Sequence, residues 1–233
     1  MDYKNADALV ESDWLADRLN DSGMRIVDAT WYLPDVNRSG RDEYAERHIP
    51  GAVYWDLDEI ADPADPLPHM LPDAATFAGH MARLGIGDGM KVVVYDGVSS
   101  MAAPRVWWML RSFGHDDVAV LNGGLTKWLV EDRPTDGEAP AIGTGQFTAT
   151  VRPYMVRDIA AVRANLVNQT EQVIDARSIG RFTGADPEPR PNCHSGHIPG
   201  SANLPYADLI DGETKMFRPA DALAERFAAS GIA

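Results

Sequence analysis

Cysteine is nearly absent from this sequence, which holds one, Cys193, among 233 residues. A single cysteine excludes an intrachain disulfide framework and a cysteine-rich metal site, so the chain fits a reducing compartment. Apolar runs of about 18 residues, the length needed to span a membrane, are also missing. The N-terminal stretch lacks the basic start and apolar core of a signal peptide. Together these absences predict a cytoplasmic protein without a membrane segment.

A basic stripe is missing as well. The 21 Lys and Arg residues are outnumbered by 35 Asp and Glu, which gives a formal net charge of −14. Nucleic acid is therefore a disfavoured partner, because a phosphate backbone is bound by clustered positive charge. We interpret the acidity as the solvated surface of an enzyme. A hydrophobic content of 45% over this length supports one large or two modest domains with buried cores.

The chain contains an internal repeat. Three short motifs occur twice in the same order: HIPG at 48–51 and 197–200, DA at 28–29 and 175–176, and GI at 85–86 and 231–232. The spacing between copies stays nearly constant, at 149, 147 and 146 residues in turn. This regularity indicates a tandem duplication. We predict a first domain over residues 1–134, a linker over 135–150 that is rich in Pro, Gly and acidic residues, and a second domain over 151–233.

Both halves alternate strand-like and helical patterns, which favours an α/β fold with a parallel sheet flanked by helices. The first half predicts strands at 24–30, 52–57, 91–95 and 118–121, and helices at 7–20 with Ser12 as a helix cap, 41–47, 74–84, 102–113 and 125–128. The second half predicts strands at 172–176 and 201–205 and helices at 156–166 and 220–229. The block at 87–130 has no counterpart after residue 232, so we expect the second domain to be incomplete.

Four side chains are candidates for chemistry. Arg181 and Arg190 lie nine residues apart in a loop rich in Gly and Pro, so their guanidinium groups could converge on one anion such as a carboxylate. The alternative is a pair of solvated loop arginines. His69, in a proline-rich loop, could act as an acid, a base or an orienting group, or could be a surface histidine. Asp58 could orient His69, or could only form a turn.

Three further features receive a structural interpretation. The loop that begins at Asp96 follows a predicted parallel strand, where ligands commonly bind, but no Cys or His follows, so we interpret it as a noncatalytic copy. Cys193 is the only possible thiol nucleophile, and His194 beside it could activate it. Its spacing does not suit a helix start after a strand, so we interpret it as an incidental thiol. The recurrence of His48 and His197 indicates a role in the turn.

Each half carries a set of short motifs. The second half carries DAR at 175–177, GRF at 180–182, PEPR at 187–190, GHIPG at 196–200 and Asn203. The first half carries RHIPGA at 47–52, HMLP at 69–72, PRVWW at 104–108, and NGG at 122–124 with Trp128. Both sets resemble the motifs of the two-domain rhodanese-like sulfurtransferases, in particular the 3-mercaptopyruvate branch. The resemblance covers nearly the whole chain.

This resemblance implies two rhodanese domains, of which the first is inactive. The family's nucleophilic Cys belongs to the loop of the second domain that corresponds to residues 96–101, so it is expected beyond Ala233 and absent from this chain. Cys193 does not match it. The resemblance also implies that Arg181 and Arg190 hold the carboxylate and carbonyl of the substrate. His69 and Asp58 match residues that form a relay with a Ser of the missing loop.

The implied reaction moves sulfur from 3-mercaptopyruvate or thiosulfate to a thiol or to cyanide through a Cys persulfide, without a metal or an organic cofactor. The expected partners are therefore a small-molecule sulfur donor and a thiol acceptor, with possible self-association through the incomplete second sheet. A different class of function stays open. The chain could be a noncatalytic rhodanese-like module that binds an anion or a partner through Arg181 and Arg190.

Overall fold

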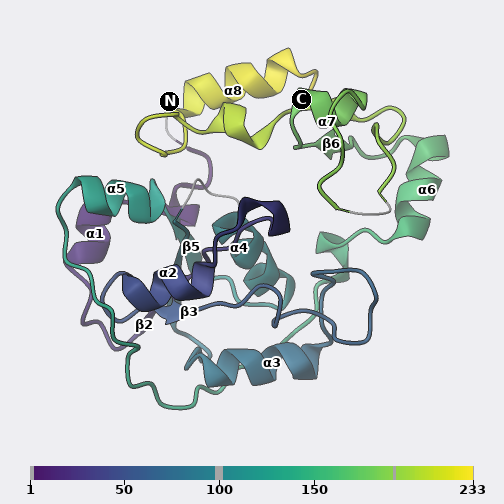
Figure 1. Ribbon diagram of the computed structural model, residues 1–233. Helices are drawn as coiled ribbons and strands as arrows, with labels where there is room; N and C mark the ends of the chain where they lie inside the picture. The colour runs from purple at the N-terminus through teal and green to yellow at the C-terminus, as the bar shows by residue number, and fades with distance from the viewer. Residues whose placement is uncertain (1–2, 98–101, 191–192, 233) are drawn as a thin grey trace.

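A parallel sheet organises the first unit of the protein, which we define as residues 3–134. The computed structural model describes residues 3–97, 102–190 and 193–232. The sheet has five strands in the order β1-β5-β4-β2-β3, and every neighbouring pair is parallel. The strands are β1 Leu9–Val10, β2 Met24–Asp28, β3 Val53–Tyr54, β4 Lys91–Tyr95 and β5 Val118–Leu121. The predicted α/β fold with a parallel sheet is confirmed (Figure 1).

Helices cover both faces of this sheet. They are α1 Ser12–Ala16, α2 Gly40–Glu46, α3 Ala74–Arg83, α4 Ala103–Ser112 and α5 Gly124–Val130. Helices α3 and α4 contribute Phe77 and Val106 to one core cluster, and α1 and α5 contribute Leu15 and Trp128 to the other. Strand β4 lies between the two clusters, with four of its five residues buried. A continuous apolar run is what such a doubly covered strand requires.

The N-terminal prediction is wrong in part. Residues 9 and 10 form a strand and pair with Val120 and Leu121 at the edge of the sheet, where the sequence pattern predicted helix. Pairing with β5 outweighs the weak local helical spacing. Ser12 is the first residue of α1 rather than its cap, and Glu11, at the cap position, makes no capping hydrogen bond with its side chain.

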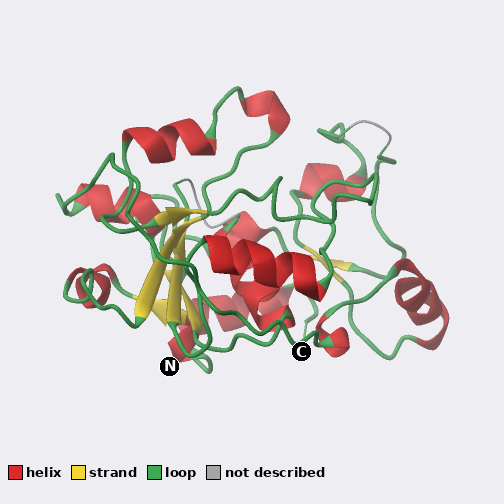
Figure 2. Ribbon diagram, turned by 90° about the horizontal axis from the view of Figure 1, so that it is seen from below, coloured by secondary structure: helices red, strands yellow, loops and turns green. Residues whose placement is uncertain are grey.

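The second unit, which we define as residues 151–232, is built around a short two-stranded parallel sheet. Its elements are α6 Ile159–Asn168, β6 Ile174–Asp175, α7 Ile179–Thr183, β7 Ala202–Asn203 and α8 Ala220–Ala229. Figure 2 shows this small sheet separate from the larger one. The predicted strands and terminal helices are present. Helix α7 was not predicted, although Ser178 caps its start and Gly184 ends it in a left-handed conformation.

The second unit repeats part of the first at matching positions. Helix α8 spans the residues 146 positions after α3, and β7 those 149 positions after β3. The strand registers correspond as well: Val27 is opposite Val53 in the first unit, and Ile174 is opposite Ala202 in the second. The sequence repeat therefore coincides with a repeat of local structure.

The two HIPG turns share the same contacts. His48 Nδ1 lies 2.7 Å from the carbonyl oxygen of Tyr44, and the two rings stack. His197 Nδ1 lies 2.8 Å from the carbonyl oxygen of Phe182, again with stacked rings. The glycine of each motif has a positive φ, a conformation that glycine adopts without strain. These contacts support the interpretation of both histidines as turn residues.

The two units differ in their cores. Among the described residues of the second unit, none in α6, α7 or α8 is buried. Leu204 and Ile210 are buried in this unit, but seven other large apolar side chains from α6 onward are exposed: Ile159, Leu166, Val167, Ile174, Ile179, Ile198 and Tyr206. Strand β2 is hydrogen-bonded on both sides, to β3 and β4, whereas β6 pairs with β7 alone in the described part of the chain. The second unit thus has an open sheet edge and little core of its own.

The second unit packs against the first instead. The Tyr3 hydroxyl donates to the carbonyl oxygen of Arg218 at 2.8 Å, and the Phe217 amide donates to Asn122 Oδ1 at 2.9 Å. An apolar groove lies between α8 and the first unit, with Trp107 on one side and Phe227 on the other. None of the helices in the described ranges is long and apolar enough to cross a membrane.

The predicted linker, 135–150, runs over the first unit as coil. Phe147 reaches the ring of Phe77 at a centroid distance of 5.7 Å and packs against the core. Thr148 donates to both carboxylate oxygens of Asp88, from its amide at 2.8 Å and from its hydroxyl at 2.6 Å. This segment is therefore fixed to the first unit along its second half.

Candidate functional site

His69 lies at the centre of the candidate site. Its backbone has φ of +61°, a left-handed conformation that is uncommon outside glycine and often found at functional sites. Its Nε2 lies 2.6 Å from Asp58 Oδ1, and the side chain is 12% exposed. Trp31 Nε1 donates to the other oxygen of Asp58 at 3.0 Å, and the Trp31 ring meets His69 edge-on. The structure thus joins the two predicted residues of the first unit.

Arg190 of the second unit contacts the second ring nitrogen of His69. Its Nη2 lies 3.1 Å from His69 Nδ1. A guanidinium group can only donate, so Nδ1 must accept, and the proton of a neutral His69 resides on Nε2, where it is donated to Asp58. The result is a continuous chain of polar contacts from Asp58 through His69 to Arg190, across the boundary between the units.

We expect nuclear magnetic resonance to detect this tautomer. In long-range ¹⁵N–¹H correlation spectra of the chain at alkaline pH, His69 should show the Nε2–H pattern. His48 and His197 serve as internal controls, because each places Nδ1 against a backbone carbonyl and should show the Nδ1–H pattern. An Nδ1–H signal from His69 would contradict the contact with Arg190.

Arg105, in the first turn of α4, also contacts His69. Its Nη2 donates to the His69 carbonyl oxygen at 2.5 Å, and its guanidinium carbon lies 4.7 Å from the centre of the Trp108 ring. Trp108 in turn donates from Nε1 to the carbonyl oxygen of Met155, at the start of the second unit. Burial, with a further effect from the positive charge of Arg190, lowers the pKa of Arg105.

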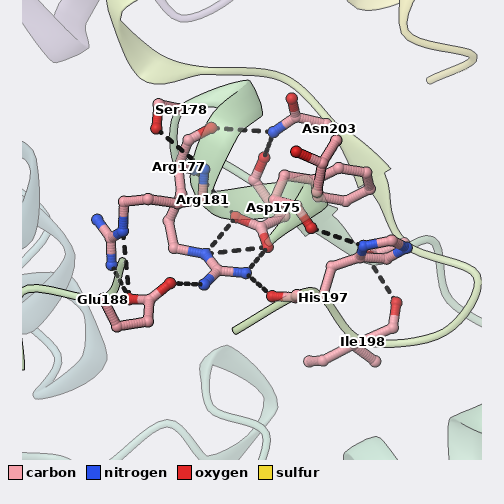
Figure 3. A network of polar contacts seen from close by, with 12 residues as sticks. Asp175, Arg177, Ser178, Arg181, Glu188, His197, Ile198 and Asn203 are labelled. Atoms are coloured by element: carbon pink, nitrogen blue, oxygen red, sulfur yellow. Dashed lines mark hydrogen bonds and ion pairs between the residues drawn. The ribbon is translucent and has the colours of Figure 1, made fainter. Parts of the chain in front are cut away.

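Arg181 lies in a separate network of ion pairs (Figure 3). Its Nη2 donates to Glu188 Oε2 at 2.6 Å, and Arg177 donates to the other oxygen of the same carboxylate at 2.7 Å. The hydrogen bond from Arg181 is the largest of the effects that lower the pKa of Glu188. Arg177 also pairs with Asp175, at the end of β6. Arg181 therefore has a carboxylate partner, and no hydrogen bond or ion pair among the described residues joins it to Arg190.

The remaining candidates lie away from these contacts. The Asp96 carboxylate accepts hydrogen bonds from the amides of Ala102 and Ala103, at 3.1 and 3.0 Å, and so caps the start of α4. Residues 98–101 of the same loop lie outside the described ranges. Cys193 is exposed. Within the described ranges, no cluster of three or more His, Cys, Asp or Glu side chains is arranged to hold a metal ion.

Sequence reasoning missed three of the residues that build the site. Arg105 and Trp108 belong to the PRVWW motif that supports the resemblance, but their spacing gave no sign that they face a loop 36 residues earlier. Trp31 lies three residues after the end of β2, and its hydrogen bond to Asp58 depends on the pairing of β2 with the parallel strand β3. The sequence indicated only where the site lies. Both Trp31 and Asp58 follow parallel strands, at the edge of the sheet where binding sites commonly form.

Comparison with known proteins decides the family. The sequence model of the rhodanese-like domain family matches residues 11–131 of this chain. The chain belongs to the rhodanese family. Human 3-mercaptopyruvate sulfurtransferase is 41% identical over 212 residues, which cover 88% of this chain and 71% of that protein. Thiosulfate sulfurtransferase of Cricetulus griseus is 42% identical over 210 residues, covering 87% and 70%.

A solved structure extends the rhodanese match to the second unit. The crystal structure of the 3-mercaptopyruvate sulfurtransferase SseA from Escherichia coli superimposes with a TM-score of 0.88 at 36% identity. The match covers 97% of this chain and 84% of that one. The membership predicted from the motifs is therefore confirmed, and the relatives include sulfurtransferases named for each of the two donors.

Proposed function

We propose that this rhodanese-family chain forms the donor-binding part of a sulfurtransferase that acts on 3-mercaptopyruvate or thiosulfate. The observation that carries the proposal is the line of contacts Asp58–His69–Arg190. It places a hydrogen-bonded carboxylate–imidazole pair beside a cation that lacks a carboxylate partner in the described part of the chain. The cation is suited to bind an anionic donor, and the carboxylate–imidazole pair is suited to relay a proton. The relatives named for both donors support it.

Each residue has a role in the proposed reaction. Arg190 and Arg181 bind the donor anion, and Arg181 keeps its Nη1 available because its hydrogen bonds to Glu188 use Nε and Nη2. A Cys thiolate attacks the sulfur of 3-mercaptopyruvate, the C–S bond breaks, and its electron pair leaves with the carbon as the pyruvate enolate. The enolate takes up a proton to give pyruvate, and His69, oriented by Asp58, is suited to move that proton. A thiol or cyanide then takes the sulfur from the persulfide. The proposed chemistry needs no metal or organic cofactor.

We assign no nucleophile within these 233 residues. Cys193 is exposed, and no hydrogen bond among the described residues links it to Arg181, Arg190 or His69. In the first unit the loop that corresponds to the family's Cys loop begins at Asp96, whose carboxylate caps α4. We therefore propose that a second rhodanese-like unit, over residues 151–233, supplies anion-binding groups but not the reactive sulfur. The cytoplasmic location stays a prediction, since one relative from Arabidopsis thaliana is named as mitochondrial.

These 233 residues alone are expected not to turn over. Pyruvate release from 3-mercaptopyruvate with a thiol acceptor should stay at the level of the uncatalysed reaction, in the unaltered chain and in Cys193→Ser alike. Turnover that survives Cys193→Ser would show a nucleophile of another kind. Turnover that Cys193→Ser abolishes would show that Cys193 is the nucleophile.

A noncatalytic anion-binding module is the second candidate. The pairing of Arg181 with Glu188 gives it a specific basis, because part of that guanidinium group is already engaged and Arg190 could bind an anion without it. Both candidates predict that Arg190→Gln weakens binding of 3-mercaptopyruvate by about tenfold, the loss expected for one charge-assisted hydrogen bond. Arg163→Gln, on the exposed surface of α6, is the matched control and should bind normally. Turnover separates the candidates, since any turnover that is measured and that His69→Gln slows belongs to an enzyme.

A further inference from the structure

Arg105 and Arg190 bring two positive charges close to His69. Arg105 contacts the His69 carbonyl oxygen and Arg190 contacts His69 Nδ1, so both guanidinium groups contact the same residue. In the described ranges neither forms an ion pair. The nearest carboxylate in this chain of contacts is Asp58, and its two oxygens are engaged by His69 and Trp31.

The placement of Arg105 is unfavourable in three respects. Its Nε is buried and has no hydrogen-bond partner among the described residues. It lies beside a second positive charge. It is also the third residue of α4, at the end of the helix where the backbone dipole is positive and repels a cation. Holding an arginine in these surroundings costs free energy of folding. A negatively charged ligand bound beside it would offset that cost.

The surroundings hold the Arg105 guanidinium in place. The Trp108 ring lies beneath it at 4.7 Å, and Trp108 is tied to the second unit through Met155. Arg111, at the other end of the same helix, shows the contrast. It lies over Trp107 in a similar way, but pairs with Asp116 at 3.5 Å. Of these two arginines on α4, only Arg105 has its positive charge unmatched.

We infer that Arg105 and Arg190 together bind a dianionic sulfur oxyanion, such as thiosulfate as donor or sulfite as its product, at the boundary between the two units. This inference rests on the proposed function and extends it, because Arg105 comes from the unit expected to be inactive. A monocarboxylate such as 3-mercaptopyruvate is neutralised by one guanidinium group. A dianion uses both, so Arg105 determines specificity between the two donor classes.

Calorimetric titration of the 233-residue chain tests the inference with thiosulfate, sulfate and 3-mercaptopyruvate as probes. Arg105→Gln is expected to weaken binding of both dianions by about tenfold or more, and binding of 3-mercaptopyruvate by less than about threefold. Arg105→Lys keeps the charge and should retain most of the dianion affinity. Arg111→Gln is the matched control on the same helix and should leave all three affinities unchanged.

The outcomes separate this inference from the proposed function. Dianion binding that is absent from the unaltered chain, or unaffected by Arg105→Gln, overturns the inference, while 3-mercaptopyruvate binding that depends on Arg190 would leave the proposed function intact. Equal losses for all three probes also overturn it, and would mean that Arg105 only positions His69. Arg105-dependent sulfate binding without any donor binding would support the inference and count against the proposed function. If Arg105→Gln fails to fold, Arg105→Lys remains decisive, because loss of dianion affinity with charge retained contradicts the inference.

Discussion

Phe77→Ala is expected to lower the free energy of unfolding of the first unit by about 3–5 kcal/mol, the range for truncating a fully buried aromatic side chain. The Phe77 side chain is 0% exposed, stacks on Phe113 at a centroid distance of 4.0 Å and contacts Trp55 and Phe147. The alanine leaves a cavity that these rigid rings cannot close. Urea unfolding followed by tryptophan fluorescence measures the loss.

The matched control is Phe227→Ala on α8. Residue 227 corresponds to the fully buried Met81 of α3 through the 146-residue spacing, but Phe227 is only partly buried and lines the groove against the first unit. The same truncation should therefore reduce the free energy of unfolding by about 1 kcal/mol or less. Similar losses for both variants would mean that α8 packs as tightly as α3, contrary to the burial described above.

Asp28→Asn is expected to abolish a loss of stability that accompanies rising pH. Burial raises the pKa of Asp28 from 3.8 to about 6, against the opposing hydrogen bonds from Thr30. Below about pH 4 the carboxyl group is protonated in both states. Between that pH and about 6 the unfolded chain releases the proton and the folded chain retains it, so the folded state loses about 3 kcal/mol of relative stability. Above that window the penalty is constant.

The difference in unfolding free energy between Asp28→Asn and the unaltered chain isolates this group from the other carboxylates. It should grow in favour of the variant as the pH rises from about 4 to 6 and then stay level. Asp116→Asn is the control of opposite sign. The hydrogen bond from Arg152 lowers the pKa of Asp116, so its contribution is present above the unfolded-state pKa and disappears as the pH falls. A difference for Asp28→Asn that does not change with pH would contradict the raised pKa.

Much of the fold could be predicted because its signals are local. Strand β4 is predicted by the apolar run 91–95, and α3 by its helical periodicity. The repeated HIPG turn predicted that β7 follows the second turn as β3 follows the first. The edge strand at 9–10 could not be predicted, because its conformation is set by pairing with β5, more than 100 residues later. Local spacing carries no information about such a partner.

The candidate site could be predicted only in part, for a similar reason. His69 and Asp58 are close in the sequence, and the structure places them in contact. Arg181 and Arg190 look equivalent in the sequence, yet one pairs with Glu188 and the other reaches His69 in the first unit. Arg105 shows the same limit, since its unmatched charge becomes visible only when the carboxylates around it have been located.

The course of residues 142–152 affects where the chain can be divided. Ile142 and Phe147 fill space in the first unit, and Thr150 donates its amide to the carbonyl oxygen of Phe113. A fragment that ends at residue 134, where composition suggests a boundary, would leave the Phe77 ring without its edge-on neighbour and Asp88 without its two donors. A recombinant first half is therefore best designed to end after Arg152, which bonds to Asp116. The boundary of an autonomous folding fragment lies where the contacts cease, well past the point at which regular secondary structure ends.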